Sequence, residues 1–351
     1  MQRTQRVVLV AFAGGVRSQE VLESPENAPN LARLRSAGVT LPNVRAQNVG
    51  HYGAALSIFT GNVEVMGIRE NERGLNPTLF EYLRKDVGLG SGDIWLSTAS
   101  GAQGRLFAHS DHPDYGAEFG ANVLDGDGIF NVEFKRVLDS FGRPRPDTPA
   151  QQQVMERLSR AMDGSQLENL TVAAPDSNEQ RRVEKFILDE LSGNNTRLTG
   201  PGAADAKAIR IGSNILRVFR PRVLGITLQS ADIAHSSFNG YVEVIRRNDE
   251  ELGVLWDAIQ EDDELRDSTS IFVLPEFGRD KDLNERNGLD HGDRSDYLRK
   301  VFLIAAGPGI AKNKVVKKDV QTIDVCPTVL SLFDRKAPTY SSAKVIREIF
   351  A

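Results

Sequence analysis

Five uninterrupted apolar runs of strand length constrain the fold more than any other feature of this sequence. They are VVLVAF (7–12), IWLSTA (94–99), VLGITL (223–228), SIFVLP (270–275) and VFLIAA (301–306). None of them alternates between apolar and polar residues, as a strand with one face in water does. The runs therefore predict strands that are covered on both faces, as in a parallel sheet.

Segments with apolar residues at helical spacing lie between these runs. They cover 28–38, 77–86 and 241–262. The basic run KAIRIGSNILRVFRPR (207–222) predicts an amphipathic helix, with arginines on its wet face, that leads into a strand. Strands that alternate with helices predict a doubly wound α/β fold with a mostly parallel sheet flanked by helices.

The organisation of the chain is that of one large domain with an interruption. A chain of 351 residues can bury a full core, and we expect a single α/β domain over 1–351. The segment 103–206 fits less well, because loop-like composition surrounds the helical patterns 153–162 and 180–191. We interpret this segment as a helical insertion or cap on the sheet domain.

Composition excludes several classes of protein. A net charge of −5 and a pI of about 5.7 argue against a nucleic-acid-binding surface. No stretch approaches the ~20 apolar residues of a membrane span. The single cysteine, Cys326, forms no intramolecular disulfide, which fits a reducing compartment. We interpret the start of the chain as a buried strand and not as a signal peptide. We expect the protein in the cytoplasm if Met1 is the native start, and exported if a leader was removed.

Ligands of doubly wound folds lie outside the carboxyl ends of the strands, so the loops there are candidates for a site. Two of the five histidines lie beside aspartates in such loops. SADIAHSS (230–237) contains Asp232 and His235, and GLDHGDR (288–294) contains His291. Each of these residues taken alone is an ordinary polar loop residue.

Seven segments, taken together and in order, resemble the motifs of one known family. They are VVLVAFAGGVR (7–17), NAPNLARLRSAGVTLPNVRAQN (27–48), HYGAALSIFTGN (51–62), DIAHSSFNGYVEVIRRND (232–249), SIFVLPEFGRD (270–280), LDHGDRSDYLRKVFLIAAGPGI (289–310) and VQTIDVCPTVLSLF (320–333). The chain resembles the alkaline phosphatase superfamily, particularly its sulfatase-like and phosphodiesterase-like branches. The resemblance implies the same α/β fold over nearly the whole chain.

The resemblance also implies a metal site. Active members of the superfamily hold two metal ions beside a Ser, Thr or modified Cys nucleophile. One of these ions is expected to bind Asp232, His235 and His291. Two imidazoles and a carboxylate suit Zn²⁺ and leave a position open, so we expect one zinc ion. Asp290, adjacent in sequence, is expected to orient His291.

The second metal site of the superfamily is degenerate in this sequence. Ala13 stands at the position of the aspartate of the first strand, and Glu276 and Phe277 stand where the family has Asp-His. Counting back from Gly61 places His51 at the nucleophile position. A methyl group and a phenyl ring cannot bind a metal, so we expect no second ion.

Two functions stay open on this evidence. The first is a pseudoenzyme that keeps one ion, lacks efficient family-type hydrolysis and binds or scaffolds a protein partner. The alternative is a one-metal hydrolase of phosphate or sulfate esters, in which metal-bound water attacks an anionic small molecule and His51 or Glu276 is the general base. Two further roles stay open for His51: it binds the metal, or it is itself phosphorylated. A phosphomutase or lyase-like relative is a third possible function, but it normally needs the same second metal site.

Two other features have open roles. The loop FAHSDHPDYG (107–116) holds His109, Asp111, His112 and Asp114, which either bind a metal or form a solvated polar loop. Arg17, in the loop after the first strand, either contacts an anionic substrate or lies on the surface.

Overall fold

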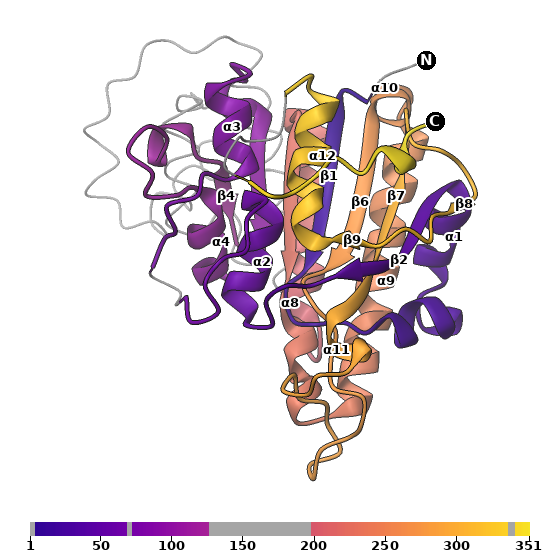
Figure 1. Ribbon diagram of the computed structural model, residues 1–351. Coiled ribbons are helices and arrows are strands. Elements are labelled where there is room, and N and C mark those ends of the chain that lie inside the picture. The colour runs from indigo at the N-terminus through magenta and orange to yellow at the C-terminus, as the bar shows by residue number, and fades with distance from the viewer. Residues whose placement is uncertain (1–3, 69–71, 126–197, 336–340) are drawn as a thin grey trace, which may run out of the picture.

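A mixed β-sheet forms the centre of the protein (Figure 1). The computed structural model describes residues 4–68, 72–125, 198–335 and 341–351. Within these residues the strand order is β4-β3-β5-β1-β6-β7-β2-β8, and β9 also pairs with β2. The strands are β1 (Arg6–Phe12), β2 (Gly38–Arg45), β3 (Ile94–Thr98), β4 (Asn122–Leu124), β5 (Val223–Leu228), β6 (Thr269–Pro275), β7 (Lys300–Ala306), β8 (Lys314–Val315) and β9 (Val320–Gln321).

All five apolar runs form strands, and the predicted mostly parallel sheet is confirmed. Among the described strands only β7 runs against its neighbours, since it pairs antiparallel with both β6 and β2. The prediction of a parallel strand at 301–306 was therefore wrong in direction. Residues 301–306 are buried, as predicted, but burial on both faces does not determine the direction of a strand.

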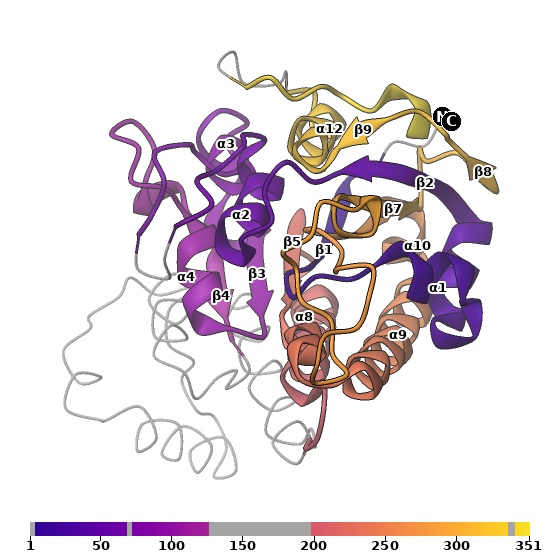
Figure 2. The ribbon, with the colours of Figure 1, turned by 60° about the horizontal axis from the view of Figure 1, so that its bottom comes forward.

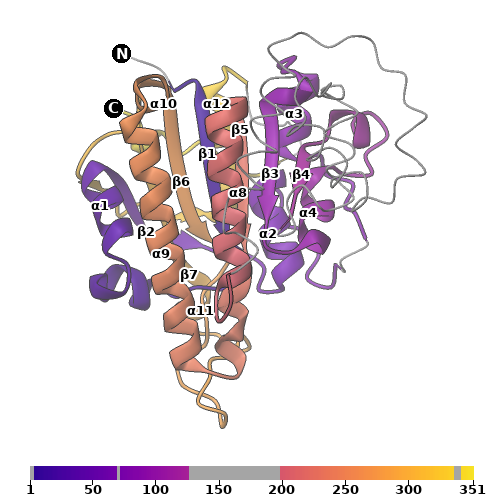
Figure 3. The same cartoon turned by 180° about the vertical axis from the view of Figure 1, so that it is seen from behind.

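Helices cover both faces of the sheet (Figures 1, 2 and 3). One face packs against α1 (Pro29–Ala37), α8 (Ala203–Phe219) and α9 (Phe238–Glu261). The other packs against α2 (His51–Thr60), α3 (Leu79–Lys85), α4 (Gly101–Ala108) and α12 (Val325–Leu332). The short helices α10 (Asp263–Ser268) and α11 (Asp296–Arg299) precede β6 and β7. In the described part of the chain no helix combines the length and apolarity that a membrane crossing requires.

The central strand β1 shows why its sequence does not alternate. Val8 and Val10 point into the core under α8 and α9, whereas Val7 and Leu9 point into the core under α2 and α12. Because both faces are covered, every position must be apolar. The helices predicted at 28–38, 77–86, 241–262 and 207–222 correspond to α1, α3, α9 and α8.

Two regions differ from the prediction or lie beyond it. Strand β2 was not predicted, because Pro42 interrupts the run and the ladder with β7 is irregular between Leu41 and Val44. Most of the proposed insertion at 103–206, including the helical patterns 153–162 and 180–191, lies outside the described residues. The described residues 122–124 form β4 at the edge of the sheet, and the insertion itself stays a prediction.

The loops after β1, β5 and β6 pack closely because glycines stand where they meet. A Cβ atom on Gly14 would lie 2.4 Å from the carbonyl oxygen of Gln229, and one on Gly288 would lie 2.3 Å from that of Ala234. The amide of Leu289 donates to the same Ala234 carbonyl over 2.6 Å. The loop between β6 and β7, which projects at the lower end of Figure 1, is thus held against the segment that follows β5.

Replacing Gly288 with Ala should destabilise the protein by about 1–3 kcal/mol, since the new methyl group overlaps backbone that cannot move independently. Gly292→Ala is the matched control in the same loop, because its Cβ would have no atom within 4 Å. Urea unfolding of both variants measures the difference. Equal free energies of unfolding would show that the two loops are not in close contact.

Candidate metal centre

Four polar side chains from separate parts of the sequence meet at the carboxyl edge of the sheet. His51 begins α2, Asp232 and His235 lie on the 3-10 segment Ser230–His235 after β5, and His291 lies in the loop between β6 and β7. One potential ligand atom from each residue lies within 4.8 Å of all the others. The structure therefore brings together the three residues that the resemblance implied and adds His51. In the described ranges this is the group of His, Cys, Asp and Glu able to hold a metal ion.

The imidazole of His51 bridges two carboxylates. Gly50 precedes the helix with extended backbone, and the His51 side chain reaches residues that follow β5 and β6. Its Nδ1 lies 2.5 Å from Oε1 of Glu276, and its Nε2 lies 2.9 Å from Oδ1 of Asp232. Glu276 directly follows β6 and is fully buried. Both predicted base candidates, His51 and Glu276, therefore contact each other directly.

His235 is held in a similar way. Its Nδ1 lies 2.6 Å from Oδ1 of Asp290, and its Nε2 lies 3.3 Å from Oδ1 of Asp232. The expectation that Asp290 orients His291 was wrong. The hydrogen bond from Leu289 to Ala234 fixes the loop so that Asp290 lies beside His235 and not beside its neighbour in sequence.

Arg279 was not predicted as a site residue. Its guanidinium is fully buried and donates to Oδ1 of Asp232 over 2.7 Å. It also donates to the carbonyl oxygens of Gly14, Gly15 and Leu289. One side chain thus joins the loops after β1, β5 and β6. The only sequence feature that pointed to Arg279 was its position in the loop after the apolar run 270–275.

The positions at which the resemblance implied ligands of a second metal are apolar and buried. Ala13 and Phe277 have no solvent exposure. Phe277 packs in a small cluster with Ala54 and Leu298. Its ring centroid lies 4.9 Å from that of His51, so an apolar ring packs against this imidazole.

The charges of the cluster shift its pKa values strongly when no metal ion is bound. Burial lowers the pKa of His51, but the carboxylates of Glu276 and Asp232 outweigh it and raise that pKa to about 9. Burial raises the pKa of Asp232, yet His51 and Arg279 hold it well below its usual range. Burial and the charges of His51 and Arg279 lower the pKa of His291 to about 4. At neutral pH the metal-free cluster therefore carries a proton on His51 and leaves His291 neutral.

Arg17 has neither of the two expected roles. Its guanidinium forms a buried ion pair with Glu20 at 2.5 Å. It also donates to the carbonyl oxygens of Asp280 and Lys281. Arg17 therefore positions the loop after β6 and is not free to bind a substrate.

The loop that contains His109, Asp111, His112 and Asp114 does not form a metal-binding group in the described structure. Nδ1 of His112 accepts a hydrogen bond from the amide of Asp114. The buried carboxylate of Glu81 accepts from the amide and hydroxyl of Ser110 and holds the loop in place. These contacts favour the alternative of a polar structural loop.

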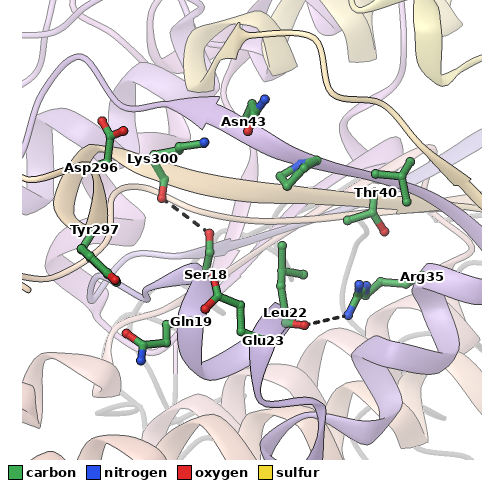
Figure 4. Close-up of a pocket in the computed structure, with 12 residues that line it drawn as sticks. Ser18, Gln19, Leu22, Glu23, Arg35, Thr40, Asn43, Asp296, Tyr297 and Lys300 are labelled. Carbon is green, nitrogen blue, oxygen red and sulfur yellow. Dashed lines mark hydrogen bonds between the residues drawn. The ribbon is translucent and has the colours of Figure 1, made fainter.

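A separate cavity of about 370 Å³ lies between the segment after β1, strand β2 and the start of β7 (Figure 4). None of the four cluster residues lines it. Its wall carries two acidic and two basic side chains, Glu23, Asp296, Arg35 and Lys300. This mixture gives the cavity no clear preference for an anionic ligand.

The fold and the cluster together define an α/β protein with a candidate metal centre, and solved structures identify the fold. The alkaline phosphatase PafA superimposes with a TM-score of 0.63 at 11% identity over 100% of both chains. The phosphonate monoester hydrolase SpPMH from Silicibacter pomeroyi has a TM-score of 0.50 at 14% identity, over 99% of this chain and 76% of its own. BT4656, solved with its substrate D-glucosamine-2-N,6-O-disulfate, has a TM-score of 0.52 at 13% identity, over 99% of this chain and 80% of its own.

The chain has the fold of the alkaline phosphatase superfamily, as the resemblance implied. No model of a protein family matches the sequence, and no curated protein matches it. At identities this low the likeness establishes the fold, and the chemistry has to be argued from the site itself.

The metal-free protein should lose stability as the pH rises from about 6.5 to about 9. A histidine whose folded-state pKa is raised stabilises the fold fully below its unfolded pKa, and this contribution disappears as the pH passes the folded value of about 9. Unfolding in the presence of a chelator should show this loss in wild type and in a His112→Gln control, and a smaller loss in His51→Gln. An identical pH dependence in all three would contradict the assigned His51 charge.

Proposed function

We propose that the protein binds one divalent transition-metal ion and is a pseudoenzyme without the two-metal hydrolysis of its superfamily. Its role is then to bind or scaffold a partner. One observation carries this proposal. The imidazole of His51 lies between Glu276 and Asp232, where the resemblance implies the nucleophile and the second ion.

The donor set of the cluster supports a single zinc ion. The two imidazoles of His235 and His291 and the carboxylate of Asp232 are ligands that Zn²⁺ prefers, and ligand atoms around tetrahedral zinc lie about 3.3 Å apart. The separation from Oδ1 of Asp232 to Nε2 of His235 is 3.3 Å. When bound, such an ion would supply positive charge beside the Asp232 carboxylate and link the loops that hold it.

The second site does not fit a metal ion. Ala13 and Phe277 offer no donor atom, and Phe277 lies against the His51 ring. Glu276 is engaged by His51 through one oxygen, and its other oxygen is buried without a hydrogen-bond partner among the described residues. Without a second ion, the charge that a phosphoryl or sulfuryl transition state develops has little to offset it.

The alternative of a one-metal hydrolase has one observation in its favour. The side chains of Asp232 and His235 are 39% and 34% exposed, so a small anionic ester can reach the centre. Against it, Glu276 is fully buried and the His51 ring is held between two carboxylates. Neither candidate base is placed to accept a proton from a molecule in the exposed part of the site.

Purified wild-type protein should contain about one zinc ion per chain, and His291→Ala should lose it. His109→Ala is the control, because it removes a histidine from outside the cluster. Elemental analysis after gel filtration measures the content. Two ions per chain in the wild type would contradict the single-site proposal.

The same preparations should hydrolyse aryl phosphate, phosphodiester and aryl sulfate equally slowly. We expect no difference in rate between wild type and His291→Ala, because the pseudoenzyme has no metal-dependent turnover to lose. Turnover that disappears in His291→Ala and persists in His109→Ala would establish the hydrolase alternative.

A further inference from the structure

We propose that His51 is the fourth protein ligand of the metal ion, so that the centre is closed by His51, Asp232, His235 and His291. This inference rests on the proposed single metal site and specifies its coordination. Three protein ligands plus an open position are typical of catalytic zinc, whereas four protein ligands are typical of structural zinc. The helix position that otherwise carries a nucleophile would then carry a metal ligand.

The hydrogen bonds of two histidines direct the correct ring nitrogen toward the centre. Nδ1 of His51 contacts Glu276, and Nδ1 of His235 contacts Asp290, each at hydrogen-bond distance. A carboxylate on Nδ1 keeps the proton there and leaves the lone pair on Nε2. Metal-binding histidines are commonly supported by a carboxylate in this way.

The free nitrogens converge on one carboxylate oxygen. Nε2 of His51 and Nε2 of His235 both approach Oδ1 of Asp232, at 2.9 and 3.3 Å. Nε2 of His51 is buried and lies 2.9 Å from Oδ1 of Asp232, a contact that is an ion pair only while the imidazole carries its second proton. In the neutral imidazole this nitrogen has no hydrogen-bond donor beside it among the described residues. A buried nitrogen in that state is costly unless a ligand satisfies it.

His291 completes the ring of imidazoles. Its ring centroid lies 4.7 Å from that of His51 and 4.9 Å from that of His235, and both contacts are edge-on. Edge-on packing lets several imidazoles direct nitrogens to one point without stacking. The ring centroid of the buried Phe277 lies 5.2 Å from that of His291.

Asp232 and His51 are each held in place by another side chain. Arg279 holds Oδ1 of Asp232 from the interior, and Glu276 holds His51 from the end of β6. His51 belongs to α2, so a bound ion would join the start of that helix to the loops after β5 and β6. Such a centre couples metal binding to folding stability.

Cobalt substitution tests this coordination without any assay of activity. Co²⁺ bound by four protein ligands should give an intense visible spectrum that azide or thiocyanate does not change. His51→Ala should still bind Co²⁺, at least 10-fold more weakly, with a spectrum that responds to these anions. Added imidazole should restore the wild-type spectrum by occupying the vacated position. His112→Ala, outside the cluster, should behave as wild type.

A second variant guards against misfolding of His51→Ala. Glu276→Gln keeps all four proposed ligands and removes the carboxylate behind His51, so Co²⁺ affinity should fall about 10–100-fold while the spectrum stays insensitive to anions. A wild-type spectrum that shifts with azide, together with an unchanged affinity of His51→Ala, would overturn the fourth ligand and leave the single metal site intact. A wild type that binds no Co²⁺ would overturn the proposed function itself.

Discussion

The contacts of the buried Arg279 guanidinium are the interaction on which the candidate metal centre depends. A charge without solvent contact is costly unless its hydrogen-bond donors are used and an opposite charge is near. Arg279 meets both conditions, because three backbone carbonyl oxygens and the carboxylate of Asp232 accept from it. The contact favours the ionised carboxylate of Asp232, and the imidazoles of His51 and His235 approach the same Oδ1.

The three carboxylates of the site differ in what they contact. Asp232 faces the cluster directly, whereas Glu276 and Asp290 lie behind His51 and His235. The supporting carboxylates are each paired with an imidazole, and the buried ring of Phe277 packs against His51. These contacts fix two imidazoles beside Asp232 without occupying the ring nitrogens that face it.

Sequence alone predicted the strands of the core because burial on two faces leaves a direct record in composition. It did not predict the direction of β7, since an antiparallel strand buried on both faces has the same composition as a parallel one. It missed β2 because Pro42 breaks the apolar run at the point where the ladder is irregular. Burial of a strand affects its own residue composition. The direction of a strand and its pairing partners depend instead on the path that the chain takes between strands.

The same distinction separates the predicted and missed parts of the site. Asp232, His235 and His291 were found because motifs in a known order brought them together. The partner of Asp290 was misassigned, since neighbours in sequence are not neighbours across a loop held by the Leu289 to Ala234 hydrogen bond. The two arginines show the contrast most clearly: Arg17 stood in a recognised motif and forms an internal ion pair, whereas Arg279 contacts Asp232 in the candidate metal centre. Residue type and motif order therefore pointed to residues that the fold brings together, but the groups that hold them in place depend on backbone packing that no motif shows.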